Sequence, residues 1–304
     1  MRNPARRNRN IGTPKQGYSK DNQLVVPSPS VDMKFFYERL GTYKVVERVI
    51  NNHKFKFVVE NTRNNSFHAC TIDDIVKVLN YIPSEDYGEL ELIILRQPTK
   101  KEENLKPAWG RLIYSYEFKG EYLPAIIIEA IDLTQKFKWP KKLNIDSQKE
   151  LERLKEDGHN IIMGKRLYEA EYKLNNIRST QLYGTLPHEF GHYVHYLEVV
   201  KRPLSKLKVK LDALDAQINY YDTQETNPLF KEWDLLDDEY FNEIMKAEKK
   251  YFSIPKSEKE VFAHTYADKL KAKLETNSII PFDRILNEDD IIDSGLSLDD
   301  FKNG

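Results

Sequence analysis

The chain has 304 residues, of which 40% are hydrophobic and 31% charged, so it can build a sizeable core under long solvated surfaces. Its formal net charge of −1 excludes a global field that would attract nucleic acid or membranes. The single cysteine, Cys70, excludes an internal disulfide framework and is typical of a small buried hydrophobe. No apolar run approaches the roughly 18 residues of a membrane span, and the first residues lack the apolar core of a signal peptide, so we expect a cytoplasmic protein.

The chain opens with a basic segment. Residues 1–20 contain six arginines and lysines and no acidic residue, and this composition cannot bury enough apolar surface to fold by itself. We therefore expect residues 1–30 to form a flexible basic arm. The arm is either a solvated tail or a docking segment for a partner or nucleic acid.

Strand patterns dominate up to residue 131. The segments 44–50 and 55–60 predict a hairpin, and residues 71–82 predict a short helix capped by Thr71, which together make a small α/β region over 31–85. Residue 86 is the expected start of a larger domain, 86–304. Three more strands are predicted there, the last two paired through a turn at Lys119: 90–97, 111–118 and 123–131.

Beyond residue 132 the pattern predicts mostly helices. A helix over 147–158 ends at Gly158, and residues 165–174 continue in the same style. Residues 203–250 predict a charged helical hairpin interrupted near 223–228. A further helix covers 257–274, and the acidic tail from Asn287 predicts a small docked element.

Residues 188–192 read HEFGH. Side chains four apart on a helix share a face, so His188 and His192 can present imidazole nitrogens to one metal ion, and Glu189 can reach a metal-bound water. Thr185 is the predicted N-cap, and Gly191 indicates that another element passes close by. The alternative is a pair of half-buried histidines without a metal.

A catalytic zinc needs a third protein ligand, and Glu260 is the candidate because Ala263 and Ala267 let its helix approach the first one closely. His195 lies about 10 Å along the helix from His188, too far to share an ion, and is expected to be packed. Glu198 is a weaker alternative to Glu260.

HEFGH, followed downstream by Glu260-x-x-Ala263-x-x-x-Ala267, resembles the gluzincin class of zincin metallopeptidases. It is similar in style to the ImmA/IrrE-type peptidases and the catalytic domain of anthrax lethal factor. The resemblance implies His188, His192 and Glu260 as zinc ligands and Glu189 as general base. Where that family often has a small polar or acidic residue, four positions after the third ligand, this chain has His264, so Asp268 is a candidate to orient a ligand instead.

The resemblance also implies an α+β, zincin-like fold: a twisted, mostly antiparallel sheet, whose edge strand lines the cleft, followed by a helical half that carries the HExxH helix. The expected function is a zinc-dependent endopeptidase acting on a protein or peptide substrate, with Zn²⁺ as cofactor. Tyr251 is the candidate donor for the developing oxyanion, with Tyr266 and His264 as competitors. The alternatives are a non-catalytic zincin-like protein that docks a partner or nucleic acid through its basic arm, and a regulatory protease that cleaves one specific protein.

Overall fold

The computed structural model describes residues 35–105, 108–221 and 228–302. The chain divides into two units, residues 1–39 and 40–304, and the predicted basic arm over residues 1–30 lies outside the described residues. The described part of the first unit contains one turn of 3-10 helix, Phe36–Glu38. The elements that follow belong to the second unit.

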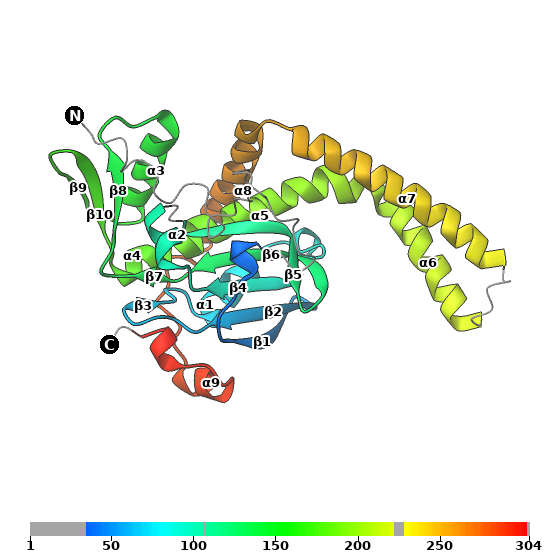
Figure 1. Cartoon of the computed structure of the whole chain (residues 1–304), viewed down its shortest axis with the longest axis horizontal. Helices are drawn as coiled ribbons and strands as arrows, with labels where there is room; N and C mark the ends of the chain where they lie inside the picture. The colour runs from blue at the N-terminus through cyan, green and yellow to red at the C-terminus, as the bar shows by residue number, and fades with distance from the viewer. Residues whose placement is uncertain (1–34, 106–107, 222–227, 303–304) are drawn as a thin grey trace, which may run out of the picture. The chain divides into compact units, whose positions relative to one another are not determined.

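A five-stranded mixed sheet organises the second unit, in the order β1-β2-β4-β6-β5 (Figure 1). Its strands are β1 (Tyr43–Ile50), β2 (His53–Glu60), β4 (Leu92–Arg96), β5 (Gly110–Phe118) and β6 (Glu121–Glu129). The two outer pairs are antiparallel, whereas β2–β4 and β4–β6 are parallel. The expectation of a mostly antiparallel sheet is therefore wrong at its centre, because the chain passes through α1 (Ile72–Leu79) between β2 and β4, and through α2 (Lys100–Leu105) and β5 between β4 and β6, so that no hairpin joins either parallel pair. The sheet also spans the expected domain boundary at residues 85–86.

Local turn and cap chemistry confirms the predicted hairpins and the first helix. Asn51 and Asn52 have positive φ angles of 50° and 63°, and Lys119 and Gly120 have 55° and 88°, as tight hairpin turns require. In α1 (Ile72–Leu79) the Thr71 side chain accepts the N–H of Asp74, as a capping residue should.

A second, three-stranded sheet was not predicted. It has the order β8-β10-β9, with β8 (Lys136–Pro140), β9 (Ile161–Met163) and β10 (Leu167–Glu171), and α3 (Ile145–Glu156) packs beside it. The helix predicted over 165–174 is therefore wrong. Ala170 pairs with Phe137 and is buried in a small aromatic core, so tertiary packing overrides the helical propensity of this segment.

Helices make up most of the remaining chain. One helical run contains α4 (Leu174–Ser179), a π-helical segment Thr180–Thr185, α5 (Leu186–Tyr196) and a second π-helical segment Leu197–Lys201. The predicted hairpin is confirmed as α6 (Ser205–Tyr221) packed on α7 (Pro228–Ser253), although most of its expected interruption lies outside the described residues. The chain then forms α8 (Lys256–Thr276) and α9 (Glu288–Asp293). None of the helices in the described part of the chain combines the length and apolar character that a membrane crossing requires.

The main core lies between one face of the five-stranded sheet and helices α1, α5 and α8. Cys70 is buried in this core, and burial raises the pKa of its thiol, as expected for a structural cysteine. The acidic tail is docked as predicted: Phe301 is fully buried, and the carboxylate of Asp300 accepts the N–H of Thr62 at 2.7 Å.

Candidate metal centre

The helix that carries the HExxH sequence is held against α8 by a close backbone contact. A Cβ added at Gly191 would lie 2.8 Å from both the Cα and the carbonyl oxygen of Ala263, so only glycine permits this approach. The predicted passage of another element beside Gly191 is thus confirmed. Thr185, in contrast, is not an N-cap: it has helical φ and ψ angles, and its hydroxyl donates to the carbonyl of Thr180, because the helix already begins upstream.

Three polar side chains converge across this contact. The Nε2 atoms of His188 and His192 lie 3.1 Å apart, and Oε2 of Glu260 lies 3.3 Å from the first and 3.7 Å from the second. Ligands held about 2.0–2.1 Å from one tetrahedral ion lie roughly 3.3 Å from each other. All three atoms, when unprotonated, can accept a hydrogen bond or bind a metal ion, so at this spacing they share either imidazole protons or a metal ion. The donor set and its spacing therefore fit zinc.

The side chains of the cluster are only partly exposed to solvent. The side chains of His188, His192 and Glu260 are 16%, 15% and 34% exposed. Hydrogen bonds from the two imidazoles lower the pKa of Glu260, so it is a carboxylate at neutral pH. The buried Nδ1 of His188 has no hydrogen-bond partner among the described residues, although metal-binding histidines usually donate from this atom.

Glu189 connects the cluster to the edge of the sheet. Its Oε2 accepts the backbone N–H of Leu112 in β5 at 2.7 Å, and β5 pairs only with β6 within the sheet. Burial raises the pKa of Glu189, while the neighbouring imidazoles of His188 and His192 and the Leu112 N–H oppose the rise. A carboxylate beside the ligand pair, oriented by an edge strand and with a raised pKa, is suited to accept and return a proton.

A fourth group, His264, reaches the same place from α8. One of its ring nitrogens lies within 4.8 Å of the ligand atoms of His188 and Glu260, and its ring packs on His188 with centroids 4.2 Å apart. Its Nε2 accepts a hydrogen bond from Nη1 of Arg153 in α3, at 3.1 Å. Burial, together with the nearby His188 and Arg153, lowers the pKa of His264 to about 4, so this imidazole is neutral.

The structure places the other predicted residues away from the cluster. Tyr251 is fully buried, and its hydroxyl contacts that of Tyr114 at 2.7 Å and donates to the carbonyl of His192 at 3.2 Å, so it supports α5 from behind. Its role as an oxyanion donor stays a prediction without a described contact to carry it. Tyr266 donates to Asp86, and Glu198 pairs with Arg202. Asp268 is exposed to solvent. His195 stacks on Phe262, as expected.

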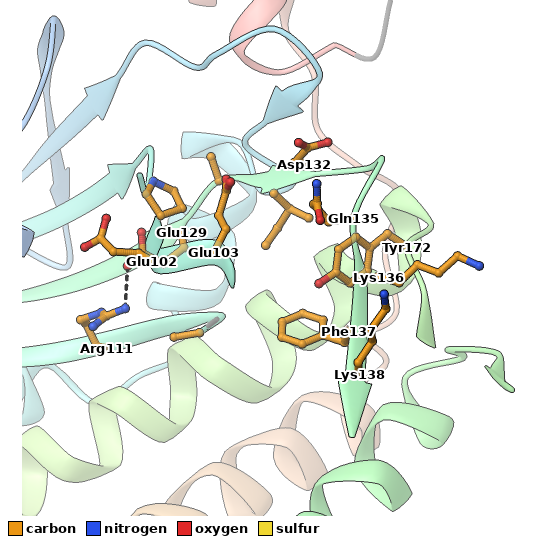
Figure 2. Close-up of a pocket in the computed structure, with 14 residues that line it drawn as sticks. Glu102, Glu103, Arg111, Glu129, Asp132, Gln135, Lys136, Phe137, Lys138 and Tyr172 are labelled. Carbon is orange, nitrogen blue, oxygen red and sulfur yellow. Dashed lines mark ion pairs between the residues drawn. The ribbon is translucent and has the colours of Figure 1, made fainter. Parts of the chain in front are cut away.

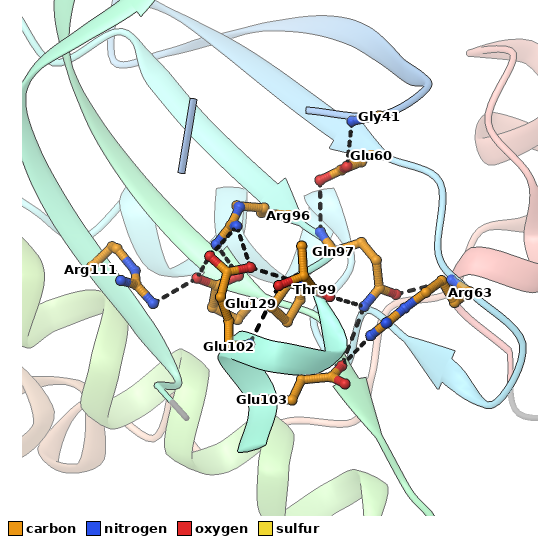
Figure 3. Close-up of polar contacts among 11 residues, drawn as sticks. Gly41, Glu60, Arg63, Arg96, Gln97, Thr99, Glu102, Glu103, Arg111 and Glu129 are labelled. Atoms are coloured by element: carbon orange, nitrogen blue, oxygen red, sulfur yellow. Dashed lines mark hydrogen bonds and ion pairs between the residues drawn. The ribbon is translucent and has the colours of Figure 1, made fainter. Parts of the chain in front are cut away.

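A separate polar network lies at the start of β5 (Figure 3). Arg96, only 1% exposed, pairs with Glu129 at 3.0 Å and with Glu102 of α2 (Lys100–Leu105) at 2.8 Å, and Arg111 pairs with Glu129 at 2.9 Å. This network forms one wall of a cavity of about 340 Å³, whose other lining residues include Lys136, Phe137 and Tyr172 (Figure 2). Its buried carboxylates are already matched by arginines, so the network serves the fold.

Comparisons with protein-family models, with curated proteins and with solved structures found no match to this chain. The functional assignment therefore depends on the geometry of the cluster. Sequence reasoning missed Arg153, because nothing in its own segment links α3 to a helix more than a hundred residues away.

Proposed function

We propose that the protein is a zinc-dependent endopeptidase of the zincin type. The observation that carries the proposal is the convergence of the His188, His192 and Glu260 ligand atoms at 3.1–3.7 Å from one another, with Glu189 beside them. His188, His192 and Glu260 would hold the ion. A bound zinc would acidify a water molecule and polarise the scissile carbonyl.

The chain's own residues supply the proton transfer and the substrate track. Glu189 takes the proton of the attacking water and returns it to the leaving amine. The hydrogen bond from Leu112 keeps this carboxylate pointed into the cluster. Because β5 is an edge strand, a peptide could pair with the outer backbone groups of β5 other than the Leu112 N–H, which Glu189 already accepts, with its side chains alternating between the two faces of the sheet.

The test combines metal analysis with hydrolysis. Wild-type protein should purify with about one zinc per chain and degrade casein in a chelator-sensitive reaction, while Glu189→Gln keeps its zinc and loses the hydrolysis. A Glu189→Gln variant with full activity would remove Glu189 from the mechanism. Cleavage of one cellular protein but not of casein would indicate the regulatory protease.

His264 supports a second candidate, a non-catalytic zincin-like protein. Structural zinc sites have four protein ligands, whereas catalytic sites keep one position open, and His264 is close enough to be the fourth. If the site is structural, His264→Ala should lose zinc as completely as His188→Ala does. If it is catalytic, His264→Ala should keep the metal, because Nε2 of His264 is already used by Arg153.

A further inference from the structure

Arg153 brings a positive charge to the metal centre from a different layer of the protein. It lies on α3, beside the three-stranded sheet, and its guanidinium donates to Nε2 of His264 at 3.1 Å. His264 in turn packs directly on His188. The half-buried guanidinium is therefore separated from the ligand group by a single imidazole ring.

Among the described residues, no carboxylate lies at ion-pair distance from the guanidinium of Arg153. Its hydrogen-bond partner is Nε2 of His264, an imidazole nitrogen and not a carboxylate. Glu150, one turn earlier on α3, accepts the indole N–H of Trp139 and interacts with the charge of Arg153 only at longer range. Arg178 and Arg202, in contrast, pair with Asp74 and Asp86. Arg284 also has no ion pair among the described residues, but it donates to the carbonyl of His68, whereas Arg153 reaches a side chain that packs on His188. A guanidinium in this position, without a paired carboxylate, can bind an anion from outside the chain.

We propose that Arg153 is a specificity-determining residue that binds a substrate carboxylate beside the metal centre. This inference rests on the proposed peptidase function and narrows its substrates to peptides that carry a negative charge near the scissile bond. In a peptide that charge comes from an Asp or Glu side chain or from the C-terminal carboxylate, and the planar guanidinium can bind either with two parallel hydrogen bonds.

Binding of short peptides tests the proposal without turnover. The zinc-loaded Glu189→Gln protein is titrated with acetyl-Ala-Glu-amide, with acetyl-Ala-Gln as the free acid, and with acetyl-Ala-Gln-amide, which carries neither carboxylate. We expect one or both acidic peptides to bind about tenfold more tightly than the neutral one. Whichever acidic peptide is preferred identifies the source of the carboxylate.

Three variants in the same background assign the preference to Arg153. Arg153→Gln should remove it, Arg153→Lys should retain part of it, and Lys155→Gln, an equal charge change at an exposed position on the same helix, should leave it intact. A preference that survives in Arg153→Gln, or a wild-type site that binds all three peptides equally, would overturn the proposal. The two proposals fail separately: Arg153-dependent binding without hydrolysis of casein or of any cellular protein by the wild-type protein contradicts only the peptidase, and hydrolysis without Arg153-dependent binding contradicts only the anion site.

Discussion

Two polar clusters meet consecutive residues of β5, and they use their charges in different ways. Arg111 joins the network of Arg96, Glu129 and Glu102, in which each buried charge has an opposite partner. The N–H of Leu112 holds Glu189, beside a cluster in which ligands face one another and Arg153 has no carboxylate. In the first arrangement the positive and negative charges pair with one another, and this pairing stabilises the fold. The second would be completed by the zinc ion and the substrate carboxylate that we propose.

The comparison predicts the largest loss of stability in the balanced network. The side chain of Arg96 is only 1% exposed and pairs with both Glu129 and Glu102. Arg96→Ala removes this buried partner, and we expect the free energy of unfolding to fall by about 3–5 kcal/mol. Urea denaturation of the metal-free protein measures this change. Zinc bound per folded chain should not change. A loss below about 1 kcal/mol would show that the network is not important for folding.

A pH titration extends the test to the buried histidine His68, whose Nε2 lies 2.8 Å from the carbonyl oxygen of Glu60. Burial lowers the pKa of His68 to about 4, below its ordinary value of 6.5, so the unfolded chain binds the proton more readily. Stability should therefore decrease as the pH falls through this window, by about 3 kcal/mol in all. Denaturation curves between pH 7 and pH 4 measure the slope, which should flatten in His68→Gln. An equal slope in that variant would assign the acid sensitivity to other groups.

A glycine pair tests whether the metal cluster depends on the contact between its two helices. In Gly191→Ala the new methyl group would meet the backbone of Ala263 at 2.8 Å, so α5 and α8 must separate, at a cost of about 1–3 kcal/mol in stability. Zinc affinity should fall as well, because the separation moves Glu260 away from the imidazoles. Gly184→Ala, in the same helical run with open space around it, is the matched control and should keep both properties. Equal zinc affinity in both variants would contradict this account.

The smallest effect on folding is expected within the cluster itself. Glu260→Gln replaces the carboxylate of a side chain that is 34% exposed with a neutral amide, so the unfolding free energy of the metal-free protein should change by less than about 1 kcal/mol. Zinc binding, measured by elemental analysis, should be lost. Glu258→Gln, exposed on the same helix, should keep the metal. A Glu260→Gln protein that retains zinc would exclude this carboxylate as a ligand.

Local patterns predicted the parts of the site that depend on helix periodicity. His188 and His192 share a face because they are four residues apart, and the alanines after Glu260 indicated a helix that can approach closely. Gly191 indicated the position of that approach, which the contact with Ala263 confirms. These inferences succeeded because each needs only the geometry of one helix and the size of its side chains.

Other features depend on contacts that no single segment encodes. Residues 167–171 have good helix formers, yet they form β10 because β8 and β9 pair with both of their edges. The parallel centre of the main sheet depends on crossovers, which hydrophobic patterns do not specify. Arg153 was missed for the same reason. Its contact with His264 forms only because the unpredicted three-stranded sheet places α3 beside α8.

The contact of Gly191 with Ala263 also makes the geometry of the cluster independent of the chain segment that connects α5 to α8. The position of Glu260 is set by helix apposition, so the outer part of the α6–α7 hairpin contributes nothing to it. Helical turns can therefore be removed from or added to α6 and α7 at Tyr221 and Pro228 while His188, His192 and Glu260 keep their spacing, provided that Tyr251 near the other end of α7 remains buried.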